Sequence, residues 1–438
     1  MNGIEIFTSL PTSLACNILR DWLRLKSVVA LDSAYCCKAN RTFFGELLQS
    51  DEYFVREKCQ YPLSRELNAL PKFGGKIRSM NIKANLADMQ ARSVVQYCHN
   101  LTQLYLNGPW CSPTVLCATL NVNRGIEMLS INFDEMRLGP AEHMLSLAGI
   151  SLPQLKALAL TGYTCEHIYI VDALQMSSSI VRLDLCGATL MKSTLVAVQQ
   201  LCPNLTSLGV ADTSFATPWS DDALSELTAA CPYILHLDIG SAFYYEGSSE
   251  LTDAGILAVV QNLKGLQSLS MESNDSLSYA SSVHVYTHCA NTLHTLRLDC
   301  YHYILQNDLY VISAYNTLFE RCTQLRYLYF SDWQEGSARD VGITLPASTL
   351  RNLTTLILEG GVVCDRNLTA IRNYGSNLHY LGLFSVTIDN VSPSLIMLAL
   401  VELYIEIGAV DLSVYKRDGL TVGGAIPDHL MRFNVLDM

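Results

Sequence analysis

Two histidines one helical turn apart are the clearest candidates for chemistry in this 438-residue chain. His284 and His288 stand in the segment HVYTH, and Cys289 follows directly. Two imidazoles at this spacing can share a zinc ion, and in metalloproteases the residue after the first histidine is a glutamate that acts as general base. Val285 occupies that position. We therefore expect ordinary helix residues here and no bound metal.

Fifteen cysteines are the second candidate for metal or redox chemistry. No two of them have the C-x-x-C spacing of a zinc knuckle. Cys98, Cys202, Cys231 and Cys322 each stand three residues before an apolar residue that opens a recurring motif, and Cys289 stands four before one. A cysteine that recurs at one repeat position behaves as a small buried hydrophobe. The pattern favours a structural role.

Other catalytic signatures are missing from the sequence. It contains no P-loop, no G-x-S-x-G and no G-x-G-x-x-G, and the glycine pairs at 360–361 and 423–424 are typical of turns. A Ser/His/Asp triad is defined in space, so spacing alone does not identify one. We expect a protein without enzyme activity and without a cofactor.

The recurring motif is apolar-x-x-apolar-x-apolar, and CPNLTSLGV at 202–210 contains one copy. Fourteen copies begin at Ile77, Leu101, Ile126, Leu155, Ile180, Leu205, Ile234, Leu266, Leu293, Leu325, Leu353, Leu378, Leu400 and, weakly, Leu430. Successive copies are 22 to 32 residues apart. That period is typical of a leucine-rich-repeat solenoid.

The spacing inside each copy explains why the repeats stack. Its last two apolar residues are two apart, so both point to the same side of a strand. One unit cannot bury that side alone, whereas stacked units close a continuous core. Between copies, 221–231 and 251–263 have helical apolar spacing and follow the good N-cap residues Ser220 and Thr252. We predict an α/β horseshoe over 76–438, with about 13–14 repeats, a parallel sheet on the concave face and helices outside.

Three glycosylation sequons are explained by the same register. Asn100, Asn204 and Asn352 each begin the triplet NLT directly before the first leucine of a copy. Glycosylation needs export, and the first residues, MNGIEIFTSLPTSLACNIL, have no basic segment ahead of an apolar core, so they do not resemble a signal peptide. We expect these residues to serve the repeat.

Charge and hydropathy restrict the partners and the compartment. Residues 1–83 hold 12 basic and 8 acidic residues, and the remainder holds 17 basic and 33 acidic residues. The net charge is therefore +4 in the first part and −16 in the second. An acidic body argues against nucleic-acid binding, which needs cations to displace phosphate counterions. No apolar run reaches the roughly 18–20 residues that span a bilayer. With many cysteines and no export signal, we expect reduced thiols in the cytoplasm and/or the nucleus.

The repeats resemble those of a known family. CPNLTSLGV, CPYILHLDI and LTDAGILAVV are similar to the cysteine-containing leucine-rich repeats of F-box/LRR proteins, over roughly residues 76–438. Residues 10–44 resemble an F-box, a three-helix motif that docks on Skp1-type adaptors of cullin (SCF) ubiquitin ligases. The match is good from Leu10 to Leu19 and decays afterwards, because the Val-Cys-Lys-x-Trp ending is not present and Ser13 stands where an acidic residue is usual.

The resemblance implies a division of the chain and a set of adaptor contacts. Residues 1–50 would form the F-box-like helical segment, and 51–75 a linker or N-terminal cap. The adaptor contacts would come from Leu10, Pro11, Leu14 and Ile18. The alternative is that the N-terminal helices only cap the solenoid, whose first repeat needs a cover.

The third, fifth and seventh residues of each copy face away from the core and tile the concave sheet. In the early and middle copies they are small and polar, and Asp184, Asp238, Glu272 and Asp299 make the face acidic beside Arg182 and Arg297. In the late copies the outward residues include Tyr327, Tyr329, Ile357, Tyr380, Phe384 and Tyr404, together with Glu359, Glu402 and Glu406.

Neighbouring parallel strands lie about 4.8 Å apart, so the late residues should form one patch. Exposed aromatic clusters with a polar rim are typical of binding hot spots. We expect a target protein with lysine or arginine beside apolar residues. The alternative is that an inserted loop, or the tail at 407–429, covers the patch.

The sequence thus predicts a substrate receptor of a ubiquitin ligase. A scaffold unrelated to ubiquitin is the first alternative. A GTPase activator similar to the Ran activator family is the second, and the mixed, apolar ending DHLMRFNVLDM argues against it, since that family has a strongly acidic tail.

Overall fold

A computed structural model describes the chain as two compact units, Met1–Ile180 and Val181–Met438. The described residues are 15, 59–60, 71, 74–82, 93–94, 96–106, 113–133, 147, 149–162, 165–211, 214–215, 220–240, 251–272, 277–299, 309–331, 344–360, 362–363, 365–384, 387–388, 402–406 and 420–422. The predicted adaptor contacts Leu10, Pro11, Leu14 and Ile18 lie outside these residues, and the boundaries at 50 and 75 stay predictions.

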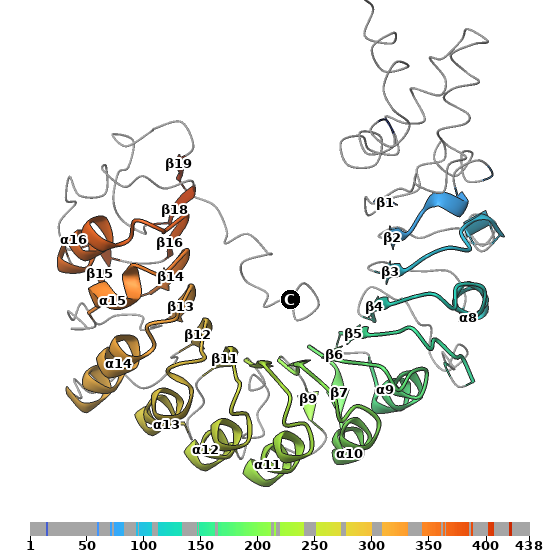
Figure 1. Cartoon of the computed structure of the whole chain (residues 1–438), viewed down its shortest axis with the longest axis horizontal. Helices are drawn as coiled ribbons and strands as arrows, with labels where there is room; N and C mark the ends of the chain where they lie inside the picture. The colour runs from blue at the N-terminus through green and yellow to red at the C-terminus, as the bar shows by residue number, and fades with distance from the viewer. Residues whose placement is uncertain are drawn as a thin grey trace, which may run out of the picture. The chain divides into compact units, whose positions relative to one another are not determined.

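The first unit is built on a parallel sheet whose strands pair in chain order (Figure 1). The strands are β1 (Cys59–Gln60), β2 (Ser79–Ile82), β3 (Gln103–Leu106), β4 (Met128–Asn132) and β5 (Ala157–Thr161). The 3-10 helix η1 (Gly74–Lys76) and the α-helices α8 (Pro113–Val122) and α9 (His167–Leu174) belong to the same unit.

The second unit repeats this plan. Its parallel strands are β6 (Arg182–Asp184), β8 (Ser207–Gly209), β10 (His236–Ile239), β11 (Ser268–Glu272), β12 (Thr295–Asp299), β13 (Tyr327–Ser331), β14 (Thr355–Glu359), β16 (Tyr380–Phe384), β18 (Glu402–Glu406) and β19 (Leu420–Val422). Its helices are α10 (Lys192–Leu201), α11 (Asp221–Ala230), α12 (Asp253–Asn262), α13 (Tyr279–Cys289), α14 (Leu309–Arg321), α15 (Ala347–Leu350) and α16 (Asp365–Tyr374).

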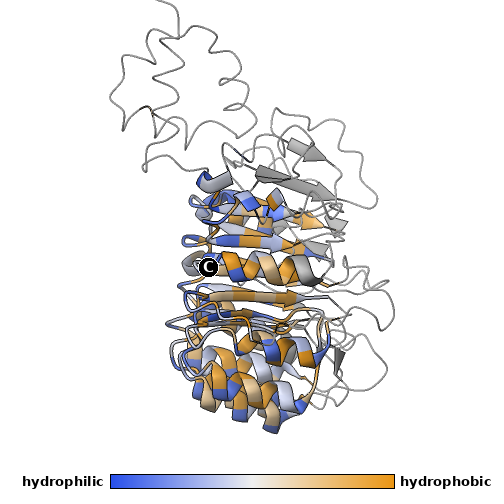
Figure 2. Cartoon of the chain, turned by 90° about the vertical axis from the view of Figure 1, so that its right-hand side faces the viewer, coloured by the Kyte–Doolittle hydropathy of each residue, from blue (hydrophilic) through white to orange (hydrophobic). Residues whose placement is uncertain are grey.

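The helices of the second unit line one side of its sheet (Figure 1). The helices that face the viewer in Figure 2 show polar and apolar residues mixed along their length, as expected for helices with one buried face. Two short parallel pairs, β7 (Thr189–Leu190) with β9 (Ser214–Phe215) and β15 (Val362–Val363) with β17 (Thr387–Ile388), lie outside the main sheet.

The predicted repeat register is confirmed. In each of the first thirteen motif copies, a strand begins two residues after the first apolar residue. The copy at 205–210 is typical, because Leu205, Leu208 and Val210 are all buried. The weak fourteenth copy at Leu430 lies outside the described residues, and the last described strand is β19. The chain is an α/β solenoid of leucine-rich type.

The recurring cysteines are buried, as expected. Cys98, Cys202, Cys231, Cys289 and Cys322 are free thiols with at most 1% of their surface exposed. Burial raises the pKa of Cys98, Cys202 and Cys322 to about 12 and that of Cys231 and Cys289 to about 11. These thiols therefore stay protonated at neutral pH and behave as small apolar groups.

The NLT triplets connect each repeat to the one before it. Asn100 Nδ2 donates to the Gly75 carbonyl at 2.8 Å, and Thr102 Oγ1 donates to the Arg78 carbonyl at 3.2 Å. In the second unit, Asn352 Nδ2 and Thr354 Oγ1 donate to the carbonyls of Thr323 and Arg326 at 2.7 and 2.9 Å. For Asn100 and Asn352, the structure thus confirms a structural role, because each side chain is hydrogen-bonded to the preceding repeat.

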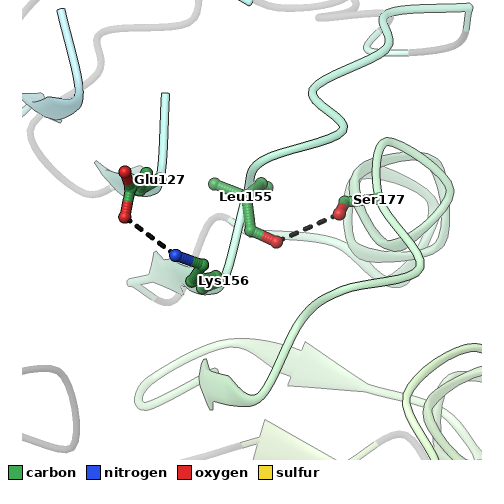
Figure 3. A network of polar contacts seen from close by, with 4 residues as sticks. All are labelled: Glu127, Leu155, Lys156 and Ser177. Atoms are coloured by element: carbon green, nitrogen blue, oxygen red, sulfur yellow. Dashed lines mark hydrogen bonds and ion pairs between the residues drawn. The ribbon is translucent and has the colours of Figure 1, made fainter. Parts of the chain in front are cut away.

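Other contacts between repeats are also polar, and they differ in exposure. In the first unit, Lys156 Nζ lies 3.1 Å from Glu127 Oε2, and Ser177 Oγ donates to the Leu155 carbonyl at 3.0 Å (Figure 3). The side chains of the ion pair are half exposed, so solvent screening leaves it a small contribution to stability. The serine bond is buried and satisfies a carbonyl at the start of β5.

Aspartates at helix starts hold the next helix in the second unit. Asp221 accepts hydrogen bonds from Thr252 N at 2.8 Å and Thr252 Oγ1 at 2.6 Å. Asp253 accepts from the amides and hydroxyls of both Ser278 and Ser281. Burial alone would raise the pKa of Asp253, but these hydrogen bonds outweigh burial and lower that pKa. Ser220 and Thr252 are N-caps, as predicted.

Gly255 is required by the first of these links. A Cβ atom at this position in α12 would overlap the Asp221 carboxylate and a Leu251 methyl group. Glycine to alanine in an open helix stabilises by about 1 kcal/mol. Here we expect Gly255→Ala to lower the free energy of unfolding by about 1–3 kcal/mol, because the clash must displace the carboxylate.

Urea denaturation followed by circular dichroism measures this change. Gly125→Ala is the control, since nothing lies within 4 Å of a Cβ there, and it should change stability by less than about 0.5 kcal/mol. A Gly255→Ala chain more stable than the parent would show that Asp221 does not occupy this space.

Candidate functional site

The inner face of the second unit is the side of its sheet that lies away from the helices (Figure 1). Strand pairing arranges its outward residues in two main rows. The first row is Arg182, Ser207, His236, Ser268, Thr295, Tyr327, Thr355 and Tyr380, and the second is Asp184, Gly209, Asp238, Ser270, Arg297, Tyr329, Ile357 and Gly382. The face is therefore acidic and small at β6–β11, and aromatic at β13–β16.

The aromatic cluster comprises Tyr327, Tyr329, Ile357, Tyr380 and Phe384, and the structure brings all five together. Their contiguity was predicted from the repeat register. The predicted exposure was wrong, because Tyr329, Ile357, Tyr380 and Phe384 have 0–6% of their surface exposed and Tyr327 is partly buried. This burial agrees with the alternative that the side chains are covered.

Gly382 is part of the physical reason for the burial. It lies in the middle of β16 and has no side chain, so the rings on either side fold over it. A Cβ at Gly382 would lie 2.5 Å from the Phe384 ring and 3.2 Å from the Tyr380 ring. The sequence analysis did not recognise this glycine, whose place between two aromatic residues in YLGLF is the signal that could have shown it.

Polar groups surround the aromatic cluster. The Tyr329 hydroxyl donates a hydrogen bond to Glu359, one of the predicted partner-binding residues. The Arg297 guanidinium lies 4.8 Å from the centre of the Tyr329 ring, within the range of a cation–π contact. Burial raises the pKa of Tyr327 to about 12, and Arg297 opposes this shift. Tyr404 and Glu402 occupy paired positions on β18, opposite Gly382 and Tyr380.

The Asp238 site is the acidic part of the inner face and comprises Asp184, Gly209, Asp238, Gly240 and Ser270. Gly209 pairs with Asp184 on one side and with Asp238 on the other. Asp238 Oδ1 accepts from the Gly240 amide at 3.0 Å, and Asp184 Oδ1 accepts likewise from the amide two residues later. Both carboxylates are thus held by their own strands at either side of a position without a side chain.

Asp238 is a buried carboxylate with 4% of its surface exposed. Burial raises its pKa to about 6, with a further increase from Asp184; Ser270, the Gly240 amide and Arg297 lower it. The Ser270 hydroxyl lies beside the carboxylate but does not reach the geometry of a well-formed hydrogen bond. Within the described part of the chain, Asp238 has no ion-pair partner.

Neighbouring polar atoms are buried without partners as well. Ser268 Oγ, Arg182 Nε and His236 Nδ1 are inaccessible to water and form no hydrogen bond with the part of the chain that the structure describes. Burial lowers the pKa of His236, with a contribution from His294, and so favours its neutral imidazole. Unsatisfied buried groups are rare and costly in native proteins. Their concentration beside Asp238 marks this part of the inner face as a candidate binding site.

The described residues give no support for a metal site or for a membrane-spanning helix. His284 and His288 lie on α13, and Cys289 is buried at its end. Among the residues that the structure describes, no group of three His, Cys, Asp or Glu side chains could hold a metal ion. In the same residues, no helix combines the length and the apolar character that crossing a bilayer requires.

Comparison with known proteins adds little to these observations. No protein-family model matches the chain, and no curated protein matches it. A solved structure titled "Crystal structure of Rad7 and Elc1 complex in yeast" contains a chain with 14% identity and a TM-score of 0.39. The match covers 81% of this chain and 89% of that one. A likeness at this level says nothing about what this chain does, and the fold class stands on the strands and helices themselves.

Proposed function

We propose that this chain is a non-enzymatic substrate-receptor subunit of a cullin (SCF-type) ubiquitin ligase in the cytoplasm or nucleus. The observation that carries the proposal is the repeat array itself. Its inner face carries polar and aromatic side chains that take no part in the core between the sheet and the helices. Solenoids use such faces to bind other proteins. The F-box-like sequence at the N-terminus, Leu10 to Leu19, supplies the ligase part of the proposal.

In this proposal the two ends of the chain have different partners. Leu10, Pro11, Leu14 and Ile18 contact a Skp1-type adaptor, and the inner face presents a target protein. Of the predicted target contacts, Tyr327, Tyr404, Glu359 and Glu402 remain in the proposal, since Tyr329, Ile357, Tyr380 and Phe384 are buried. No side chain of this protein performs chemistry, because the ligase accelerates ubiquitin transfer by holding its substrate close.

Co-expression with a tagged Skp1-type adaptor tests the adaptor contact. We expect the intact chain to copurify with the adaptor and the double variant Leu10→Asp/Leu14→Asp to lose it, since two charges would replace apolar contacts. Ser13→Asp is the matched control, because it adds a charge where the F-box family has an acidic residue, and it should retain capture.

An intact chain that is folded but captures no adaptor would contradict the proposal. The N-terminal residues would then act only as a cap, and the chain would be a scaffold that binds its partners without the ubiquitin system.

A further inference from the structure

The strongest unexplained feature of the molecule is the Asp238 site. Its carboxylate is buried and lacks an ion-pair partner in the described part of the chain. Burying a charge is costly unless the charge is paired. The fold does not need an ionisable group at this position, since the equivalent positions on β8 and β11 are Gly209 and Ser270.

Two glycines adjoin Asp238 on the inner face. Gly209 lies opposite it on β8 and Gly240 lies two residues after it on the same face, and neither carries a side chain. A Cβ atom at Gly240 would lie 3.1 Å from Ser270 Oγ and 3.3 Å from Asp238 Oδ1. The hydroxyl and the carboxylate therefore converge on the position above Gly240.

Three further polar groups lie in the adjacent row. Ser268, with 1% of its surface exposed, has a hydroxyl oxygen without a partner. Among the described residues, His236 Nδ1, which can accept a hydrogen bond, and Arg182 Nε, which can only donate one, are also buried and unpartnered. The row and the Asp238 site thus offer hydroxyl and imidazole acceptors around one carboxylate, in addition to Asp184 across Gly209.

We infer that the Asp238 site receives the basic side chain, lysine or arginine, of a partner protein bound on the inner face. An ammonium or guanidinium group would pair with Asp238 and donate to the Ser268 and Ser270 hydroxyls, which accounts for the unpaired carboxylate and for these two unpartnered oxygens. The aromatic cluster on β13–β16 lies on the same face of the same sheet, so the partner would carry apolar residues at a distance from its basic residue.

This inference rests on the proposed function only in assigning the inner face to a protein partner. It gives that partner a chemical class, and it does not require an adaptor. Charge complementarity favours this partner, because the residues after 83 carry 33 acidic and 17 basic side chains.

Selection from a phage-displayed library of random peptides on the immobilised full chain tests the inference. We expect the selected peptides to share a lysine or arginine, with apolar residues at a distance from it. Replacing that basic residue with norleucine should weaken binding by about tenfold or more, measured by fluorescence anisotropy. The Asp238→Asn chain should bind the original peptide more weakly by a similar factor, and it should bind the norleucine peptide as the parent does.

Glu226→Gln is the matched control, because it removes the same charge from an exposed position on α11, and it should leave the affinity unchanged. Three results would overturn the inference: selected peptides without a basic residue, equal affinity of the parent and Asp238→Asn chains, or no selected peptide at all. A cation from elsewhere in this chain that already occupies the site would produce the last result.

The two proposals fail separately. Basic peptides bound through Asp238 by a chain that captures no adaptor would leave the inference intact and remove the ligase function. Adaptor capture by a chain that selects no basic peptide would do the reverse.

Discussion

Asn123→Ala is expected to lower the free energy of unfolding by about 3–5 kcal/mol. Asn123 has 1% of its surface exposed, and its side chain forms three hydrogen bonds, two of which join it to the preceding repeat of the first unit. Its Oδ1 accepts from the Leu101 amide at 2.9 Å, and its Nδ2 donates to the carbonyls of Cys98 at 2.9 Å and Thr119 at 3.0 Å. Alanine would leave the Leu101 amide and the Cys98 carbonyl buried without this partner, at a cost of about 1–3 kcal/mol each.

Urea denaturation measures the loss, and hydrogen exchange locates it, because the Leu101 amide should lose its protection. Asn121→Ala is the matched control, since Asn121 is an exposed residue of α8 only two positions away, and it should change stability by less than about 0.5 kcal/mol. If both alanine variants unfold at the same urea concentration as the parent, Asn123 does not hold the repeats together.

Asp238→Asn is expected to raise the free energy of unfolding by up to about 3 kcal/mol above pH 6. Burial raises the pKa of Asp238 from 3.8 to about 6, so the folded chain binds this proton more tightly than the unfolded chain. The protonated carboxyl group therefore favours the folded chain: its contribution to the free energy of unfolding is complete below about pH 4 and is lost as the pH rises through about 6. Asparagine keeps the bond from the Gly240 amide and removes the charge, so the variant escapes that loss.

Unfolding in urea at pH 8 and at pH 4 measures this difference. The gain should be largest at pH 8 and close to zero at pH 4. The charged and titratable groups around Asp238 are Arg182, Asp184, Cys186, His236 and Arg297, and the asparagine variant leaves all of them in place. Asp238→Asn less stable than the parent at pH 8 would show that a cation already pairs with Asp238 in the free chain. If removal of the Asp238 charge stabilises the chain, the fold does not need that charge, as expected for a residue that is retained for binding.

The architecture could be predicted because it depends on local spacing. The motif from Leu205 fixes which residues of its strand are buried, and the same spacing correctly predicts the start of thirteen strands of the main sheet, β2 to β6, β8, β10 to β14, β16 and β18. Ser220 and Thr252 were recognisable as N-caps because a cap acts within three residues of its own helix. The buried cysteines followed from their fixed distance to each motif.

Contacts between repeats could not be predicted in the same way. The Asn123 bond to Leu101 spans 22 residues and the Asp221 bond to Thr252 spans 31. No local pattern distinguishes these side chains from exposed ones such as Asn121. The aromatic cluster was placed on the correct face, since outward position follows from register. Its burial was missed, because it depends on how the Tyr380 and Phe384 rings fold over Gly382.

The Asp238 site was foreseen in part. Asp184 and Asp238 were predicted on the inner face, with Arg182 and Arg297 as possible counterions. The structure instead places Arg297 over the Tyr329 ring and leaves Asp238 without an ion pair in the described residues. Which cation pairs with which carboxylate depends on side-chain positions across several strands, and sequence spacing does not contain that information.

The affinity of the purified full chain for a purified Skp1-type adaptor tests the central claim most directly. Titration calorimetry should give a one-to-one complex with a dissociation constant in the micromolar range or below, and Leu10→Asp/Leu14→Asp should abolish the heat of binding. No binding by a parent chain that shows a normal cooperative urea transition would contradict the claim that this solenoid serves a ubiquitin ligase.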